Sequence, residues 1–220
     1  MNYLVIDLEM CKVPKNYRGK KYKYANEIIQ VGAVLLDEEY ETIGKINQFV
    51  HPEYGVIDNF ISKLTGIQNN QVKNAPCLQD VLKHMVDWIG EREYKVYAWS
   101  DSDYKQLQHE ILSKGIADCK IDSFMNPERW MDYQDIFGKR FAFSKAVSLE
   151  DALMYCDIEA VGRLHDGLSD AVNTAKIIKT LELDKEFVLC NYETNFQEDS
   201  EPFGFCMGDL FAGLNLGCVA

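Results

Sequence analysis

The stretch YLVIDLEM, residues 3–10, opens with an apolar run and then carries Asp7 and Glu9 two positions apart. A short apolar run of this kind is typical of a buried β-strand. Because side chains alternate between the two faces of a strand, both carboxylates point to the same side. Two carboxylates in a buried position repel each other unless a cation lies between them. Acids at strand ends also commonly point into water, so this pair alone does not establish a cation site.

Beyond this stretch, the chain alternates strand patterns with helix patterns. We expect four further strands, within residues 27–37, 44–52, 94–99 and the start of 129–137. Helix patterns occupy residues 78–90, 103–115, 148–156 and 165–182. Residues 37–44 are typical of a hairpin connection. Strands that alternate with helices indicate an α/β sandwich, and the hairpin makes its sheet mixed.

Two of the helix patterns predict individual side chains. In residues 103–115, Leu107, Ile111 and Leu112 are expected to face inward. Ser148 is expected to cap the following helix, with Asp151 at the capping-box position.

Length and composition limit the class of protein. The chain has 220 residues, of which 47% are hydrophobic, so it can form one α/β domain with a substantial core, with or without an appendage. No stretch is apolar enough to span a bilayer, and the first strand begins too early to leave room for a signal peptide. Seven cysteines without a zinc-binding spacing indicate reduced thiols. We therefore expect a cytoplasmic protein without a membrane partner.

The net charge of −12 argues against a protein that coats long nucleic acid, which usually has a basic face. However, residues 12–23 hold six of the 23 basic residues and no acid, and Tyr17, Tyr22 and Tyr24 are interleaved with them. This run is either a solvated loop or a loop that contacts phosphates and stacks on bases. On the second interpretation, the candidate phosphate contacts are Lys20, Lys21 and Lys23. The acidity elsewhere favours a short engaged segment, such as a 3′ end.

Three more candidate residues follow later in the chain. Asp103 comes after a predicted strand and in the first turn of a predicted helix, although Asp101 competes for the same role and an Asp there is also a common helix cap. Asp170 falls in the first turn of the last helix, and His165 lies just before that helix. A lone histidine is more often a structural residue. Beside gathered carboxylates it suggests a base that activates metal-bound water, hence a metal-dependent phosphodiester hydrolase. Arg163 could contact phosphate or lie on the surface.

These segments together resemble the DEDDh exonucleases of the DnaQ-like superfamily, the group that includes ribonuclease T. Within it, the chain is most similar to the enhanced-RNAi and histone-mRNA type of 3′ exonuclease and to the bacterial KapD proteins. The matching segments, which span about residues 3–183, are VIDLEM (5–10), ISKLTGI (61–67), WSDSD (99–103) and GRLHDGLSDAVNTAKII (162–178). Ser169 stands where close relatives usually carry a second acid, and the basic run is outside the shared pattern.

The resemblance implies a ribonuclease-H-like three-layer α/β/α fold with a five-stranded mixed sheet. It also implies a 3′-5′ exonuclease that releases nucleoside 5′-monophosphates from single-stranded RNA or DNA. Two Mg²⁺ or Mn²⁺ ions would be held by Asp7, Glu9, Asp103 and Asp170, with His165 as the general base. The residues expected to contact the terminal nucleotide are Met10, Leu64, Thr65 and Ile67.

The domain prediction is an exonuclease domain over residues 1–186 and a tail over residues 187–220. The tail begins polar and acidic, becomes apolar and rich in glycine, and has no assigned role beyond a possible protein partner. Two alternatives stay open from the sequence. One is a catalytically idle nucleic-acid-binding module on the same fold, and the other is an interaction protein that works through the tail.

Overall fold

The computed structural model describes residues 1–19 and 22–190. Five strands form one sheet in the order β3-β2-β1-β4-β5. Their bounds are Asn2–Lys12 (β1), Asn26–Leu36 (β2), Thr42–Phe49 (β3), Tyr94–Ala98 (β4) and Trp130–Asp132 (β5). The pairs β1–β2 and β2–β3 are antiparallel, whereas β1–β4 and β4–β5 are parallel. The predicted five-stranded mixed sheet is therefore confirmed.

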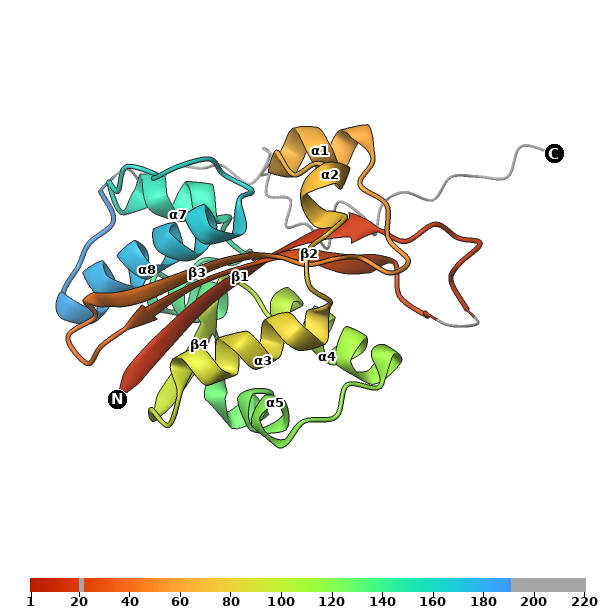
Figure 1. Cartoon of the computed structure of the whole chain (residues 1–220). Helices are drawn as coiled ribbons and strands as arrows, with labels where there is room; N and C mark the ends of the chain where they lie inside the picture. The colour runs from red at the N-terminus through yellow and green to blue at the C-terminus, as the bar shows by residue number, and fades with distance from the viewer. Residues whose placement is uncertain (20–21, 191–220) are drawn as a thin grey trace.

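Helices cover both faces of this sheet, which gives the predicted three layers (Figure 1). Figure 1 shows α3, α4 and α5 below the sheet, α7 and α8 above it, and α1 and α2 over the right-hand part of β1 and β2. Within the described residues the helices are α1 (Asn59–Thr65), α2 (Asn69–Val72), α3 (Leu78–Ile89), α4 (Ser102–Lys114), α5 (Cys119–Phe124), α6 (Tyr133–Arg140), α7 (Leu149–Tyr155) and α8 (Gly167–Leu183). None of these helices is long and apolar enough to cross a membrane.

Strand β1 separates two hydrophobic cores. Its even-numbered apolar residues, Leu4 to Met10, join the core that includes α3, whereas Val5 joins the core that includes α8. Positions 7 and 9 follow in the same alternating series as Val5, so the two acids take the place of apolar residues on the α8 side. Each buried aliphatic side chain contributes about 1.5–3 kcal/mol. These two cores let the fold tolerate acids at the end of the strand.

Two side-chain predictions have opposite outcomes. Ser148 caps α7 as predicted, because its hydroxyl accepts a hydrogen bond from the Asp151 backbone N–H at 3.1 Å. The inward placement of Leu112 is wrong, since its side chain is 74% exposed. The buried face of α4 is instead Asp103, Gln106, Leu107 and Glu110, and Leu112 lies on the opposite side of the helix.

The sequence patterns also missed the short helices α1, α2 and α5. Each has no more than seven residues, too few to establish a helical repeat of apolar positions. The domain boundary at residue 186 stays a prediction. Phe187 and Leu189 pack against the α8 core, and residues 191–220 of the predicted tail are outside the described part of the chain.

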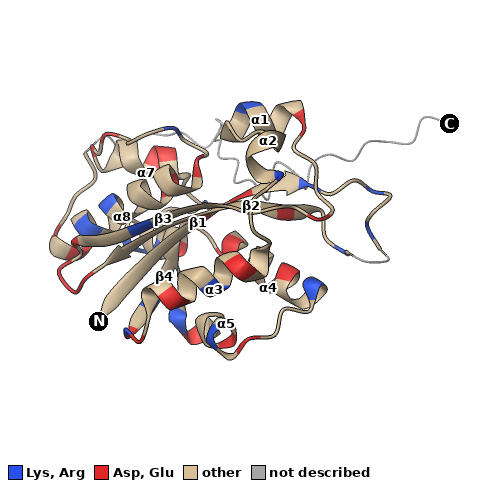
Figure 2. Cartoon of the chain, viewed as in Figure 1, with Lys and Arg blue, Asp and Glu red and all other residues tan. Residues whose placement is uncertain are grey.

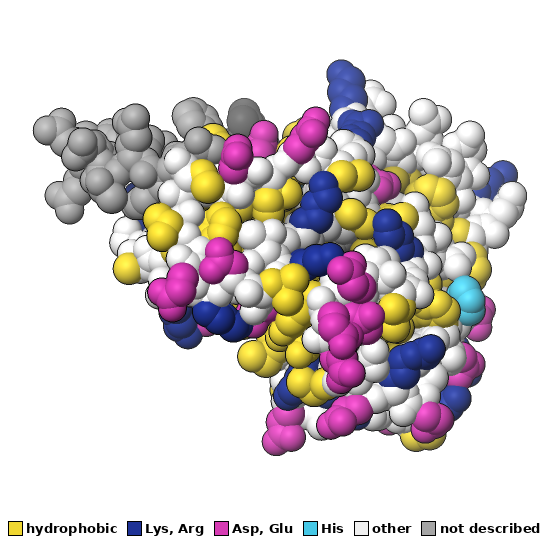
Figure 3. Space-filling model, turned by 90° about the vertical axis from the view of Figure 1, so that its left-hand side faces the viewer, with side chains coloured by type: hydrophobic (Ala, Val, Ile, Leu, Met, Phe, Trp, Pro, Cys, Tyr) yellow, Lys and Arg dark blue, Asp and Glu magenta, His cyan; other side chains and the backbone are white. Residues whose placement is uncertain are grey.

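Figure 3 shows the face at the left-hand side of Figure 1, where acidic and basic side chains are interspersed. Exposed ion pairs join the helices to the strands, as between Lys179 of α8 and Glu41 before β3 at 2.6 Å. Such exposed pairs contribute only about 0–1 kcal/mol each. This mixture of signs differs from the continuous basic surface with which proteins bind long nucleic acid.

The N-terminus of α8 rests directly on the sheet through two glycines. A Cβ at position 32 would overlap the backbone of Gly167, and a Cβ at position 167 would lie 3.1 Å from the backbone oxygen of Asp7. Because neither residue has a side chain, the first turn of α8 reaches β1 and β2 beside the two acids.

Gly32→Ala should lower the free energy of unfolding by about 3 kcal/mol or more, because the added methyl has no space and the helix must move away. The matched control is Gly138→Ala in α6, where a Cβ meets nothing within 4 Å. That change should be neutral or stabilise the protein by up to about 1 kcal/mol, because alanine favours a helix. Chemical denaturation measures both, and equal effects would contradict the close contact.

Candidate metal centre and active site

The first part of the site is the acid pair on β1. Glu9 is 2% exposed and Asp7 is half-buried. Across the strand pair, Asp7 lies opposite Gly32 and Glu9 lies opposite Gln30. The register then shifts between Glu9 and Met10, which leaves Ile29 of β2 without an opposite residue. A bulge bends the strand that carries the extra residue, so β2 bends directly beside the Glu9–Gln30 pair.

The second part is the start of α8. Asp166 caps the helix by accepting from Ser169 N–H at 3.0 Å, and Asp170 lies in the first turn, 6% exposed. The buried side chain of Gln30 fixes this helix end to β2: its oxygen accepts from Gly167 N–H at 3.0 Å, and its amide nitrogen donates to Asp166 at 2.9 Å. Asp170 therefore lies on a helix, α8, whose first turn is hydrogen-bonded to Gln30, the residue opposite Glu9 in the sheet.

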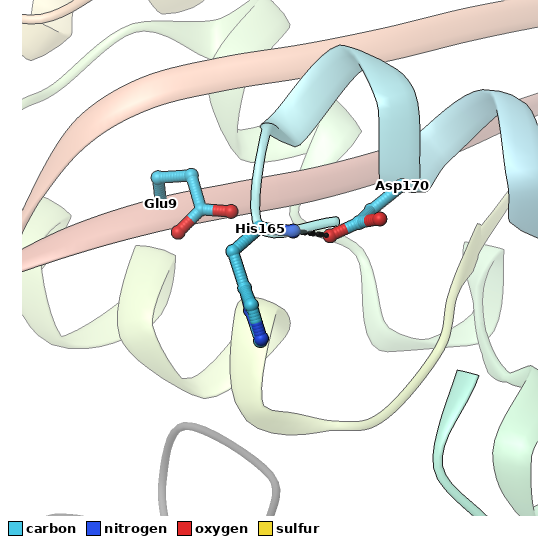
Figure 4. A group of neighbouring side chains, drawn as sticks. All are labelled: Glu9, His165 and Asp170. Carbon is cyan, nitrogen blue, oxygen red and sulfur yellow. Dashed lines mark hydrogen bonds between the residues drawn. The ribbon is translucent and has the colours of Figure 1, made fainter. Parts of the chain in front are cut away.

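His165 completes the group from the loop before α8. One ligand atom from each of Glu9, His165 and Asp170 lies within 4.8 Å of the others. In Figure 4, Glu9 extends from β1 and Asp170 from the first turn of α8, on either side of His165. The backbone N–H of His165 donates to Asp170 at 2.7 Å, and its φ of 60° is in the left-handed region. A non-glycine residue in that region is held there by its surroundings.

Asp103 approaches the same point from the edge of β1. In the described part of the chain, β4 pairs with β1 only over Asn2–Val5. Beyond that pairing, the backbone N–H of Leu8 donates to the Asp103 carboxylate. Asp103 is 5% exposed in the first turn of α4. The competing Asp101 is exposed and forms an ion pair with Lys105 at 2.5 Å. The structure thus places Asp103, and not Asp101, beside the other acids.

The carboxylates strongly affect one another. Burial, followed by the charges of Asp103, Asp170 and Glu9, raises the pKa of Asp7 well above its usual range. Burial also raises the pKa of Glu9, to which Asp170 and Asp103 add. Burial raises the pKa of Asp103 to about 8 and that of Asp170 to about 7, although hydrogen bonds from the backbone of Leu8 and His165 oppose the shift. Burial lowers the pKa of His165, which favours the neutral imidazole.

The carboxylates can hold divalent cations. Among the described residues, the buried oxygens Glu9 Oε2 and Asp170 Oδ1 have no hydrogen-bond partner. A buried carboxylate oxygen without a partner is costly, and a cation at this point would satisfy both oxygens. Mg²⁺ and Mn²⁺ prefer oxygen ligands of this kind. The residues present therefore fit a divalent metal centre.

The predicted nucleotide contacts lie mostly inside the fold. Met10, Thr65 and Ile67 are buried, whereas Leu64 is half-buried. The Thr65 hydroxyl donates to Ile61 O at 2.9 Å and accepts from Ile67 N–H at 3.0 Å. This hydroxyl stabilises the turn after α1, so a contact to a nucleotide from Thr65 would use its backbone.

The basic run forms a loop anchored on α4. Tyr22 is fully buried and Tyr24 stacks on His109 with ring centroids 3.9 Å apart, so the expectation of two free stacking residues at these positions is wrong. Aromatic anchors of this kind hold the loop while Tyr17 and Lys23 stay exposed. Lys20 and Lys21 are outside the described residues. Figure 2 shows the basic residues of this loop at the right, beyond the end of β1.

The sequence analysis missed two kinds of residue in the site. Gln30 and Asp166 join β2 to α8, and Gly32 permits their close approach. A signal for Gln30 and Gly32 exists, since both interrupt an otherwise apolar strand pattern, EIIQVGAVLL. Asp166 gives no distinct signal beside Asp170.

Comparisons with known proteins agree with this fold and site. The family model for exonucleases matches residues 4–178, and the chain belongs to this family. It is 30% identical to ERI1 exoribonuclease 2 of Danio rerio over 200 residues, which covers 82% of this chain and 35% of that protein. It is 26% identical to human (Homo sapiens) 3'-5' exoribonuclease 1 over 166 residues, which covers 72% of this chain and 47% of that protein. The chain thus spans about half or less of these relatives.

A solved structure has the same fold as this chain. The nuclease domain of 3'hExo, described as a DEDDh family member bound to rAMP, superposes with a TM-score of 0.68 at 25% identity. The superposition covers 83% of this chain and 92% of that domain. The resemblance to the DEDDh exonucleases is confirmed.

Without metal, the stability of the protein should depend on pH. Asp103 and Asp170 keep their protons in the folded state up to about pH 8 and pH 7, whereas an unfolded Asp loses its proton near pH 4. The folded state binds more protons across this window, so the free energy of unfolding falls as the pH rises from about 4 to about 8. In EDTA the melting temperature should decline accordingly. Mg²⁺ or Mn²⁺ should raise the melting temperature most near pH 8, where fewer protons compete with the metal for the carboxylates.

Matched variants separate the site from other titrating groups. Asp103→Asn and Asp170→Asn should each reduce the pH dependence in EDTA, and the exposed Asp101→Asn should change it much less, because its charge is a minor cause of the raised pKa of Asp103. If all three variants and the parent protein share one pH dependence, the raised pKa values are wrong.

Proposed function

We propose that this protein is a divalent-metal-dependent 3′-5′ exonuclease that releases nucleoside 5′-monophosphates from the 3′ end of single-stranded RNA or DNA. The observation that carries the proposal is the convergence of Glu9, His165 and Asp170 at one point, in a chain of the exonuclease family. These residues come from opposite ends of the sequence, so the fold itself assembles the group. Relatives named 3'-5' exoribonuclease support the direction of attack and the substrate class.

Asp7, Glu9, Asp103 and Asp170 would hold two Mg²⁺ or Mn²⁺ ions. When bound, such ions neutralise phosphate charge and lower the pKa of a bound water. The carboxylates suit this role because Glu9, Asp103 and Asp170 are buried, Asp7 is half-buried, and separate elements, β1, α4 and α8, hold them. Their mutual repulsion also favours uptake of a cation over an empty, charged site.

His165 would accept the proton of the attacking water. Burial keeps its imidazole neutral, which is the form that can accept a proton. The hydrogen bond from its backbone N–H to Asp170 holds the ring beside the carboxylates. The terminal nucleotide would lie against Met10, Leu64, Thr65 and Ile67, with backbone atoms making the contacts where the side chains are buried.

The anchored basic loop would hold the nucleotides that precede the 3′ end. Lys20, Lys21 and Lys23 are the proposed phosphate contacts, and the exposed ring of Tyr17 is available for stacking. The loop is joined to α4 through Tyr22, whose hydroxyl is bonded to Asn26 O at 2.6 Å and lies near Gln106. Because α4 also carries Asp103, the contact between this loop and the nucleic acid would have a fixed position relative to the cleavage site.

A cytoplasmic location and a protein partner for the tail stay predictions. The idle-module alternative shares the fold with the proposed enzyme, so only loss or retention of activity on changing the site separates the two.

Substitutions in the site should abolish activity without unfolding the protein. Asp7→Asn and Asp103→Asn remove metal ligands, and His165→Ala should lower kcat by about 10²–10⁴-fold because the general base is lost. The control is Asp101→Asn, which changes charge equally two residues from Asp103 but outside the site, and it should keep activity. Release of mononucleotides from 3′-labelled single-stranded RNA and DNA, side by side, measures each. Activity of Asp7→Asn near that of the parent protein would reject the metal assignment.

Replacement of Lys20, Lys21 and Lys23 by Ala should weaken binding and flatten its salt dependence. For single strands, each lost phosphate contact should reduce the slope of log Kd against log salt by about 0.7. Replacement of Lys83, Lys120 and Lys179 by Ala removes the same charge from α3, α5 and α8 and serves as the control. An equal change of slope in the two triple variants would mean that the basic loop acts only through net charge.

A further inference from the structure

The C-terminus of α1 is held by a side chain from the loop that carries His165. The last carbonyls of a helix have no partner within the helix. At the end of α1, the Gly66 N–H donates to Ser62 O. The Arg163 guanidinium donates to both Lys63 O and Leu64 O, the latter at 3.0 Å. A cation at a helix C-terminus also interacts favourably with the helix dipole. Arg163 therefore supplies the bonds that end α1.

The backbone conformation at this junction favours glycine, and the arginine packs against it. Its φ of 79° lies in the left-handed region, and a Cβ would come within 2.7 Å of Arg163 Nη1. The guanidinium thus packs directly against the glycine of the Leu64–Ile67 segment. Arg163 is exposed, and these contacts hold its guanidinium against the surface of the segment.

The His165 loop is fixed on both sides of Arg163. Before it, the Asn173 side chain bonds both Val161 N–H, at 2.8 Å, and Val161 O, at 3.2 Å. After it, His165 N–H is bonded to Asp170. Only a few residues separate these two anchors. Arg163 lies between these two anchors and two residues from His165, so the α1 carbonyls that it bonds are joined to the same short loop.

In the part of the chain that the structure describes, every hydrogen bond between residues 157–166 and α1 comes from Arg163. At the other end of α1, the Lys12 ammonium lies over the Phe60 ring, 5.3 Å from its centroid. A helix of seven residues is marginal by itself and keeps its position through such tertiary contacts. Burial of Ile61 and Ile67 against Cys11 and Ile29 holds α1 on the sheet, and Arg163 is the hydrogen-bonded link between its C-terminal end and the His165 loop.

We propose that Arg163 is a positioning residue that joins the Leu64–Ile67 segment to the His165 loop, so that the terminal nucleotide and the base are held in one fixed geometry. This inference rests on the proposed exonuclease function, which places a nucleotide at the first segment and a general base on the second. Both bonds come from one guanidinium nitrogen, Nη2, while Nη1 packs against Gly66, so the planar arginine group fills a place that a compact lysine ammonium does not fill.

The test compares Arg163→Ala and Arg163→Lys with Arg140→Ala in the full chain. Arg140 is a matched control, since its guanidinium likewise bonds carbonyls at the end of a helix. These are Leu181 O of α8 and Asp184 O directly after it, at the end of that helix farther from Asp170. Hydrogen exchange over residues 59–67 and 162–166 should increase in Arg163→Ala and not in Arg140→Ala. On 3′-labelled single-stranded RNA, Arg163→Ala should lose roughly 10- to 100-fold in kcat/KM, with both kcat and KM affected, as expected for misplaced groups.

Added methylguanidinium should restore part of the activity of Arg163→Ala, and Arg163→Lys should recover little. Exchange in Arg163→Ala equal to that of the parent protein, or an unchanged kcat/KM, would overturn the inference. So would an equal loss of activity in Arg140→Ala, because the effect would then be one of stability alone. If the parent protein itself fails to degrade nucleic acid, the proposed function is rejected. The exchange comparison, which needs no turnover, still decides whether Arg163 joins the two segments.

Discussion

The contact between the backbones of Gly32 and Gly167 determines how the rest of the site is arranged. It brings the first turn of α8 onto the sheet at the point where the apolar face of β1 gives way to Asp7 and Glu9. Asp170 and His165 arrive with that turn, and Gln30 bonds it to β2. A side chain at Gly32 would separate the two halves of the acid cluster, and one at Gly167 would press on the backbone oxygen of Asp7. The site therefore depends first on an approach between backbones and only then on the carboxylates themselves.

This arrangement concentrates negative charge where it is least stable. The carboxylates are buried or, for Asp7, half-buried, and they repel one another and have raised pKa values. Two of their oxygens have no partner among the described residues. The two apolar cores on either face of β1 provide the favourable free energy that opposes this cost. A divalent cation removes the cost directly. An acidic protein can act on a polyanion if positive charge is present locally. Metal ions bound by these carboxylates, together with the anchored basic loop, would provide that charge.

Much of this could be predicted from the sequence, for identifiable reasons. The alternation in YLVIDLEM places Asp7 and Glu9 on one side, and helix-start positions place Asp103 and Asp170, since strand and helix periods are local properties. Gln30 and Gly32 were missed because their role depends on a helix more than 130 residues away. Leu112 was misplaced because polar residues, Gln106 and Glu110, occupy the buried face of α4. Tyr22 was assigned to the surface because its burial depends on contacts with Tyr54 and Gln106.

The central claim is that the fold gathers these carboxylates to hold divalent cations. Its most direct test is anomalous diffraction from crystals of the protein grown with Mn²⁺. The account predicts anomalous peaks in contact with Glu9 Oε2 and Asp170 Oδ1, with Asp7 and Asp103 completing the ligands. Ordered crystals saturated with Mn²⁺ that have no peak among these four carboxylates would contradict it.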